Sequence, residues 1–259
     1  MFPIRDENPI VRTPIAVIAL VGLNIASWVF VQGLGTHAAL AKSLCLYGLI
    51  PGDLLGTAPA GISIPLGPET RCVLEGTGSL LTPITSMFMH GGWFHVIGNL
   101  WFLWVFGDNV EDSMGAPRFV LFYLLCGLAA ALAQVITDPD SVVPMVGASG
   151  AIGGILGAYA RLYPRARVHT LVFFGFFFTT VSLPAVAMLG YWFLIQILGG
   201  LPVLAGASSG IAFWAHVGGF VAGVVLVGPF HQTAYLEEHR RQVPRQRARR
   251  RNTDLESRP

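Results

Sequence analysis

The stretch GASGAIGGILGAYA at residues 147–160 and the stretch AHVGGFVAG at residues 215–223 decide how this chain folds. Both are apolar, contain no Asp, Glu, Lys or Arg, and are dense in glycine and alanine. On membrane helices such small residues let two backbones approach closely. We therefore expect two helices in contact, with Gly150, Gly219 and Gly223 at or near the contact. Packing accounts for most of these glycines, but it does not account for the polar residues beside them.

The composition of the whole chain indicates a membrane protein. Of its 259 residues, 53% are hydrophobic and only 12% are charged, whereas a soluble domain needs a much larger charged fraction. Long apolar stretches that are nearly free of charge are typical of bilayer-spanning helices. Six segments fit this description, at residues 14–34, 95–111, 117–136, 149–163, 184–201 and 211–229. The sequence thus predicts an all-α membrane protein, a bundle of six transmembrane helices.

The six segments divide the chain into an N-terminal segment at residues 1–13, a membrane domain at residues 14–230 and a tail at residues 231–259. The first helix has neither a cleavage-site pattern nor a preceding basic run, so we expect it to be retained rather than removed as a signal peptide. Residues 35–93 are rich in Gly and Pro and long for a connection. Because loops of this length are usually structured or functional, we expect a long structured first loop.

One further apolar segment, residues 168–181, ends shortly before Pro184 and could form a seventh span. We favour a hairpin or a helix lying at the membrane interface, because of the arginines. With six spans, Arg161, Arg165 and Arg167 share one side with the tail, in accord with the preference of positive charge for the cytoplasm. Both termini are then cytoplasmic, and we expect a multi-pass protein of a prokaryotic plasma membrane.

Eight of the arginines lie between Arg240 and Arg258, in the tail. A basic tail after the last span is usually a cytoplasmic anchor. The alternative is binding to anionic lipid or to nucleic acid. We favour the cytoplasmic anchor beside the lipid bilayer and expect no nucleic-acid partner, with anionic-lipid contact by the arginines of residues 240–251 as the alternative. Pro244 and the absence of apolar periodicity indicate partial disorder.

The three cysteines fall in two environments. Cys126 lies in an apolar run and is expected in the core. Cys45 and Cys72 lie in the first loop, outside the membrane, where a disulfide is chemically allowed. The sequence alone leaves their pairing open.

Polar residues inside the predicted spans are costly and usually functional, and four of them stand out: His95, Asn99, Ser149 and His216. His95 and Asn99 are four residues apart and share one helix face. Measured from the cytoplasmic ends of their helices, His95, Ser149 and His216 lie roughly 18–20 Å deep. In a hydrocarbon core about 30 Å thick, all three are then at one level, about 10 Å below the outer surface.

These residue types at one level indicate nucleophilic catalysis. A Ser hydroxyl is a weak nucleophile and needs an adjacent base, which is usually a His, so we expect Ser149 as nucleophile and His216 as base. The backbone N–H of Ser149 lies at a helix start, where donors are unpaired. His95 and Asn99 could add side-chain donors to form an oxyanion hole. No carboxylate lies at this level, so the sequence predicts a Ser–His dyad without a metal or a cofactor.

Each of these residues also has a plainer interpretation. A lone Ser at a helix start usually caps the helix, and His90, His95 and His216 could instead line a proton or metal path. The spans lack the acidic residues of such a path except at their ends, and the chain has no HExxH pair of a zinc protease. The shared depth of the polar residues, with glycines at the contacts, favours catalysis.

Three motifs resemble those of the rhomboid family of intramembrane serine proteases, over roughly residues 81–223: MHGGWFHVIGN (residues 89–99), GASG (147–150) and AHVGGFVAG (215–223). The resemblance implies a six-helix fold and the same roles for the nucleophile, the base and the oxyanion donors. It also implies cleavage of transmembrane protein substrates near their outer ends, at helix-destabilising sites flanked by small residues.

The resemblance carries further expectations about single segments. Gly147 and Gly150 belong to the motif around the nucleophile, and His90 matches a loop His that we expect to be structural. Substrates are expected to enter laterally near the second and fifth helices. A mobile cap is expected between the fifth and sixth helices, at residues 199–210.

The sequence departs from the family pattern at two places. Many members carry a Trp-Arg pair in the first loop, where this chain has Leu81 and Thr82. Many also carry an aromatic residue four positions after the nucleophile, which stacks on the catalytic His; here that residue is Gly153. Trp214 and Tyr159 are candidates to support the His instead. Neither departure removes a reacting group, and the main rival interpretation is a catalytically silent relative that binds membrane clients.

Overall fold

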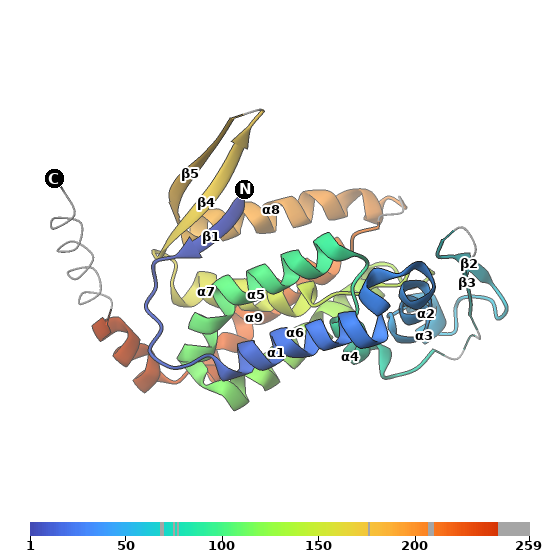
Figure 1. Ribbon diagram of the computed structural model, residues 1–259, viewed down its shortest axis with the longest axis horizontal. Helices are drawn as coiled ribbons and strands as arrows, with labels where there is room; N and C mark the ends of the chain where they lie inside the picture. The colour runs from blue at the N-terminus through green and yellow to red at the C-terminus, as the bar shows by residue number, and fades with distance from the viewer. Residues whose placement is uncertain (68–69, 75, 77, 176, 207–209, 243–259) are drawn as a thin grey trace.

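The computed structural model of the protein describes residues 1–67, 70–74, 76, 78–175, 177–206 and 210–242. This part is mostly helical, and its long helices run along one common axis (Figure 1). The helices that form the bundle are α1 (Ile15–Ala26), α5 (Trp93–Met114), α6 (Ala116–Thr137), α7 (Ser149–Leu162), α8 (Ala185–Leu204) and α9 (Phe213–Phe230). A π-helical turn at Ser27–Val31 extends α1.

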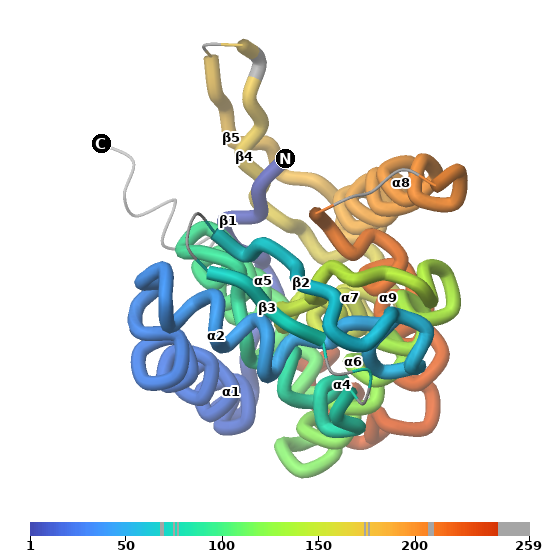
Figure 2. The backbone as a smooth tube through the Cα atoms, turned by 90° about the vertical axis from the view of Figure 1, so that its right-hand side faces the viewer, coloured from blue at the N-terminus to red at the C-terminus, as the bar shows by residue number. Residues whose placement is uncertain are grey.

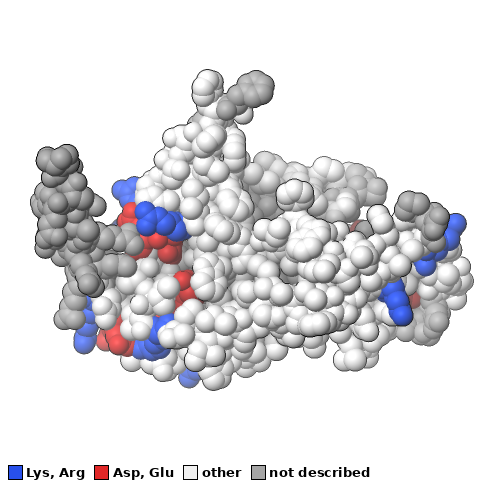
Figure 3. All heavy atoms as spheres, in the orientation of Figure 1, with Lys and Arg blue, Asp and Glu red and all other residues white. Residues whose placement is uncertain are grey.

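Each bundle helix coincides with one of the six apolar segments of the sequence. Within the described residues, the three helices α6, α8 and α9 are long and apolar enough to cross a membrane. The first helix is apolar but shorter, α5 has acidic residues near its end, and α7 has only 14 residues. On the face drawn in Figure 3, charged side chains gather toward the two ends of the long axis and leave an uncharged band between them. The crossing of the membrane by all six helices stays a prediction.

The segment between α1 and α5 contains short elements of its own. They are α2 (His37–Tyr47), α3 (Pro51–Leu54), β2 (Ser63–Pro65), β3 (Arg71–Val73) and α4 (Thr82–Thr85). A disulfide between Cys45 and Cys72 joins α2 to β3, which answers the pairing that the sequence left open. Cys126 is a buried free thiol, as expected of a core residue.

Backbone hydrogen bonds tie this first loop to the segment that leads into α7. Leu49 and Met145 exchange bonds of 2.9 and 2.7 Å. The N–H of Gly147 donates to the carbonyl oxygen of Ser86 at 2.9 Å, just after α4. These bonds attach the first loop to the segment that leads into α7. They do so although this loop has Leu81 and Thr82 in place of the Trp-Arg pair that many family members carry there.

The segment between α7 and α8 is a β-hairpin, which confirms the preference for a hairpin over a seventh span. β4 (Arg167–Phe174) pairs antiparallel with β5 (Phe177–Pro184), and β1 (Phe2–Asp6) pairs with the other edge of β4. The hairpin projects away from the bundle (Figures 1 and 2), and Phe177 and Phe178 are 81% and 71% exposed. The expected all-α fold is therefore incomplete, because pairing between β1 and a distant strand leaves no trace in local apolar periodicity.

Acidic residues at the end of α5 form hydrogen bonds and an ion pair with the residues at and just before the start of α1. The Glu111 carboxylate accepts the N–H groups of Ala16 and Val17 at 2.9 and 2.8 Å. It thereby satisfies donors of the first turn that have no partner within α1. Asp112 accepts the N–H of Arg12 at 3.0 Å and pairs with its guanidinium at 3.2 Å. The acidic residues at this end of the span thus have a structural function.

The start of the tail packs against the same end of the bundle. Residues 233–242 are helical, and the Gln232 N–H donates to the carbonyl oxygen of Ser113 at 2.9 Å. The rest of the tail, residues 243–259, lies outside the described residues and holds most of the arginines for which lipid contact and partial disorder were expected.

The helices α7 and α9 lie side by side in the bundle (Figures 1 and 2). A Cβ atom on Gly219 would lie 1.9 Å from the carbonyl oxygen of Gly150, and one on Gly223 would lie 1.9 Å from that of Gly154. Both distances are far below any van der Waals contact, so at these two points the backbones can meet only because α9 has glycine. The structure thus brings the glycines of the two small-residue stretches to one interface.

We expect Gly223→Ala to force α7 and α9 apart and to lower the free energy of unfolding by roughly 1–3 kcal/mol, as overpacking does. Thermal unfolding in detergent micelles measures the effect. The matched control is Gly190→Ala in α8, where an added Cβ meets nothing within 4 Å. Equal midpoints for the two variants would contradict a tight contact at Gly223.

Candidate active site

Ser149 is the first residue of α7, and a glycine with a special backbone conformation precedes this helix. Gly147 has a φ of +121°, which side-chain-bearing residues rarely adopt. A Cβ atom there would lie only 2.6 Å from His95 Nε2. The turn at Gly147 therefore serves two purposes: it redirects the chain into α7 and it leaves room for the His95 ring beside Ser149.

His216 lies on α9, one turn from its start, and faces Ser149 across the glycine interface. Its Nε2 atom is 2.8 Å from Ser149 Oγ, within hydrogen-bonding distance. Because the backbones of α7 and α9 are in contact, the side chains of Ser149 and His216 are long enough to form a direct hydrogen bond. The structure thus brings together the two residues that the sequence predicts as nucleophile and base.

His95 and Asn99 reach the same place from α5. The N–H of Gly91 donates to His95 Nδ1 at 3.3 Å, which leaves the ring proton of a neutral His95 on Nε2, the atom beside Gly147. The Nδ2 atom of Asn99 is buried, and among the described residues nothing accepts its hydrogens. A buried donor without a partner is costly. His95 and Asn99 thus each present an N–H donor beside Gly147.

His90 is placed differently from the four polar residues His95, Asn99, Ser149 and His216. It is fully buried, and its backbone N–H and carbonyl are held by the Gln32 side chain at 2.8 Å each. Burial, with a further contribution from nearby His95, lowers the pKa of His90 to about 3, so its ring is neutral. The ring packs edge-on against that of His95, with centroids 5.3 Å apart. His90 thus packs against His95, and its structural role stays a prediction.

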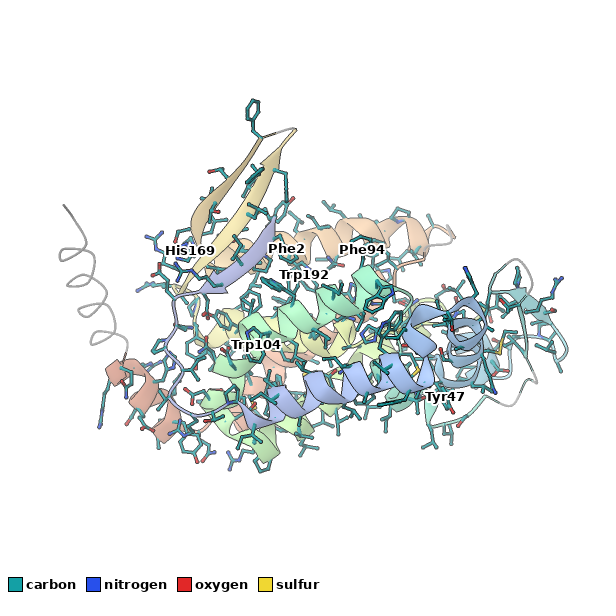
Figure 4. All side chains as sticks on the ribbon, in the orientation of Figure 1. Phe2, Tyr47, Phe94, Trp104, His169 and Trp192 are labelled. Atoms are coloured by element: carbon teal, nitrogen blue, oxygen red, sulfur yellow. A yellow bond between two sulfur atoms is a disulfide. The ribbon has the colours of Figure 1, made fainter. Side chains whose placement is uncertain are left out.

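A cavity of about 690 Å³ adjoins these residues and is lined by His95, Asn99, Ser149 and His216. Most of the other side chains of the wall are apolar, among them Phe94 of α5 and Trp192 of α8, both labelled in Figure 4. Of the cap expected at residues 199–210, residues 207–209 lie outside the described residues. Within the described residues, no group of three or more His, Cys, Asp or Glu is placed to hold a metal ion.

The support of the His216 ring comes from α8 and not from the residues that sequence reasoning suggested. Tyr159 lies at the other end of α7, where its hydroxyl donates to Asp6, and Trp214 Nε1 donates to the carbonyl oxygen of Gly200 at 3.0 Å. Instead, His216 Nδ1 is 2.8 Å from Gln196 Oε1, and the Trp192 ring lies 5.9 Å from the imidazole.

Gln196 was missed by the sequence analysis, although a signal for it exists. It is the only amide or charged side chain in α8, and polar residues inside apolar spans are usually functional.

The presence of glycine at position 153 can be explained by packing. A Cβ there would lie 3.0 Å from the carbonyl oxygen of His216, so a larger residue would strain the contact between α7 and α9.

We expect Gly147→Ala to disturb the site while leaving the dyad in place, because the new Cβ must displace the His95 ring and the φ angle becomes strained. Such strain costs about 1–3 kcal/mol. The rate at which a fluorophosphonate probe labels Ser149 should fall. Gly22→Ala in α1, where an added Cβ has open space, is the control and should label at the wild-type rate.

The Rhomboid domain model matches residues 77–233, more than half of the chain. The chain is 28% identical over 171 residues to Rhomboid protein 1, mitochondrial, of Saccharomyces cerevisiae (64% of this chain and 46% of that protein). It is 33% identical over 144 residues to Rhomboid protease GluP of Bacillus subtilis (56% and 24%). It is 37% identical over 90 residues to RHOMBOID-like protein 5 of Arabidopsis thaliana (35% and 28%).

The chain spans less than half the length of each of these three relatives. The family match nevertheless covers the whole segment that contains the four polar residues, from α5 to α9. Together with its apolar helices, this match makes the chain a membrane protein that belongs to the rhomboid family.

Proposed function

We propose that this protein is an intramembrane serine protease that hydrolyses peptide bonds of transmembrane protein substrates. The observation that carries the proposal is the 2.8 Å contact between His216 Nε2 and Ser149 Oγ beside a cavity of about 690 Å³. One of the relatives, Rhomboid protease GluP, is a protease by name. The proposed reaction class is acyl transfer to a serine followed by hydrolysis.

The dyad would work as a nucleophile and a general base. The imidazole of His216 takes the hydroxyl proton through Nε2 while Ser149 Oγ attacks the carbonyl carbon of the substrate. The same Nε2–H then protonates the leaving amine, which releases one product and leaves an acyl-serine ester. A water molecule in the cavity, deprotonated by His216, hydrolyses the ester and restores the serine.

Three donors are available to the tetrahedral oxyanion that forms during each attack. They are the backbone N–H of Ser149 at the first position of α7, Nε2–H of His95 and the buried Nδ2 of Asn99. A helix start favours negative charge, and side-chain donors fixed in a buried site need no rearrangement when the charge appears. The Asn99 amide would gain most from an oxyanion, because its buried donor would then acquire a hydrogen-bond acceptor.

The substrate would be a transmembrane helix whose outer end unwinds into the cavity. The cavity wall includes residues of α5, α7, α8 and α9, and is largely apolar, which suits a segment arriving from lipid. With six spans, the starts of α5, α7 and α9 face outside and both chain termini face the cytoplasm, so cleavage would occur near the outer face. The relatives include bacterial and mitochondrial proteins, and a prokaryotic plasma membrane stays a prediction.

We expect Ser149→Ala and His216→Ala each to abolish cleavage of a model transmembrane substrate in detergent or lipid, with little change in thermal unfolding. The control is His231→Ala, just beyond the end of α9, which should cleave normally. A fluorophosphonate probe should label the wild type at Ser149. Undiminished cleavage by Ser149→Ala would exclude the mechanism, and absence of both cleavage and labelling in the wild type would favour a silent client-binding protein.

We expect Asn99→Ala to lower kcat by about 100-fold or more with a small change in KM, since an oxyanion donor acts mainly in the transition state. Steady-state kinetics on the same substrate provide the measurement. Asn24→Ala removes another buried amide, one that donates within α1, and serves as the control for general destabilisation. A change confined to KM would assign Asn99 to substrate binding instead.

A further inference from the structure

We propose that Gln196 is the residue that orients His216. The site would then be a Ser149–His216–Gln196 triad with an amide in the third position. This inference rests on the proposed function, because it assigns a role relative to the same dyad. It is carried by the chain of two 2.8 Å contacts, Ser149 Oγ to His216 Nε2 and His216 Nδ1 to Gln196 Oε1.

The two contacts of the Gln196 amide fix which of its atoms faces the imidazole. Its Nε2 donates to the carbonyl oxygen of Trp192 at 3.3 Å, within the same helix. The Oε1 atom, which can only accept, then points at His216 Nδ1. The imidazole must therefore carry its proton on Nδ1, which leaves Nε2 free to accept from the Ser149 hydroxyl. The amide thus selects the one neutral tautomer in which the imidazole can act as a base.

The position of Gln196 is otherwise hard to explain. The side chain is 8% exposed in a helix of mean hydropathy 1.7, and an amide inside such a helix is costly unless it is hydrogen-bonded. Packing holds it at the imidazole: Phe193 of α8 stacks on Phe220 of α9 at 4.4 Å, and the Trp192 ring leans over His216. Both contacts involve residues one turn before Gln196, and they hold α8 against α9 beside the hydrogen bond.

The same contact would strengthen during the reaction. When His216 accepts the serine proton it becomes a cation, and the bond from Nδ1–H to the amide oxygen becomes charge-assisted. The other groups around the ring do not stabilise this cation. His95 of α5 repels it when both rings are protonated, and Ser149 of α7 is the source of the proton. Within the described residues, no carboxylate contacts His216. An amide in the third position also occurs in Cys–His hydrolases.

The test uses full-length protein and two substitutions. Gln196→Leu removes the acceptor but suits an apolar helix, and it should lower kcat by about 10- to 100-fold with KM nearly unchanged. The rate of fluorophosphonate labelling at Ser149 should fall by the same factor. Thermal unfolding, measured in parallel, should show an intact fold. Tyr191→Phe, which removes an exposed polar group from the same helix, is the control and should behave as wild type.

Gln196→Glu tests the orienting role through the pH profile, a quantity that a purely structural role of Gln196 would leave unchanged. It keeps an acceptor oxygen and places a carboxylate beside the imidazole, which favours the protonated ring. The acid limb of the pH profile of kcat/KM should therefore move to higher pH by about one unit or more. This variant decides the matter if Gln196→Leu fails to fold.

Two outcomes would overturn the inference while leaving the proposed function intact. One is a folded Gln196→Leu protein with wild-type kcat and labelling rate. The other is a Gln196→Glu protein whose pH profile coincides with that of the wild type. Failure of the proposed function has a different signature, namely cleavage that survives in Ser149→Ala. Because labelling needs no natural substrate, the inference can be tested before a substrate is known.

Discussion

The site depends on one contact, the meeting of two helix backbones through glycine. Added Cβ atoms on Gly219 and Gly223 would lie 1.9 Å from carbonyl oxygens of α7, so even alanine could not be accommodated without separating the helices. At this separation a serine and a histidine can bond directly at 2.8 Å. In a membrane, where apolar surface gains little by leaving lipid, such close van der Waals packing is a main force that holds helices together.

The glycine contact disfavours an aromatic residue at position 153, and this constraint shapes the rest of the site. At Gly153 a Cβ would already press on the carbonyl oxygen of His216. Support for the imidazole comes instead from α8, which supplies Trp192 and Gln196. The geometry of His216 is thus linked to the packing of a third helix, and a shift of α8 would move the acceptor of its Nδ1 proton.

Much of the bundle could be predicted from the sequence, for a physical reason. A span is defined by its own apolar length, and a polar residue inside it is conspicuous because lipid cannot solvate it. The expected depths of His95, Ser149 and His216 rest on the fixed rise of a helix and stay a prediction. The strand at Phe2–Asp6 could not be predicted in this way, because its hydrogen-bond partners lie in a hairpin more than 160 residues later.

The sequence by itself determined the helical segments, the small-residue faces and the four polar residues that come together, because each is a property of a short stretch of chain. Only the tertiary structure decided the disulfide between Cys45 and Cys72, the attachment of Tyr159 to Asp6 and the hydrogen bond from His216 to Gln196. Each of these contacts joins separate segments. Their partners are selected by how the elements pack in space, which local periodicity does not encode.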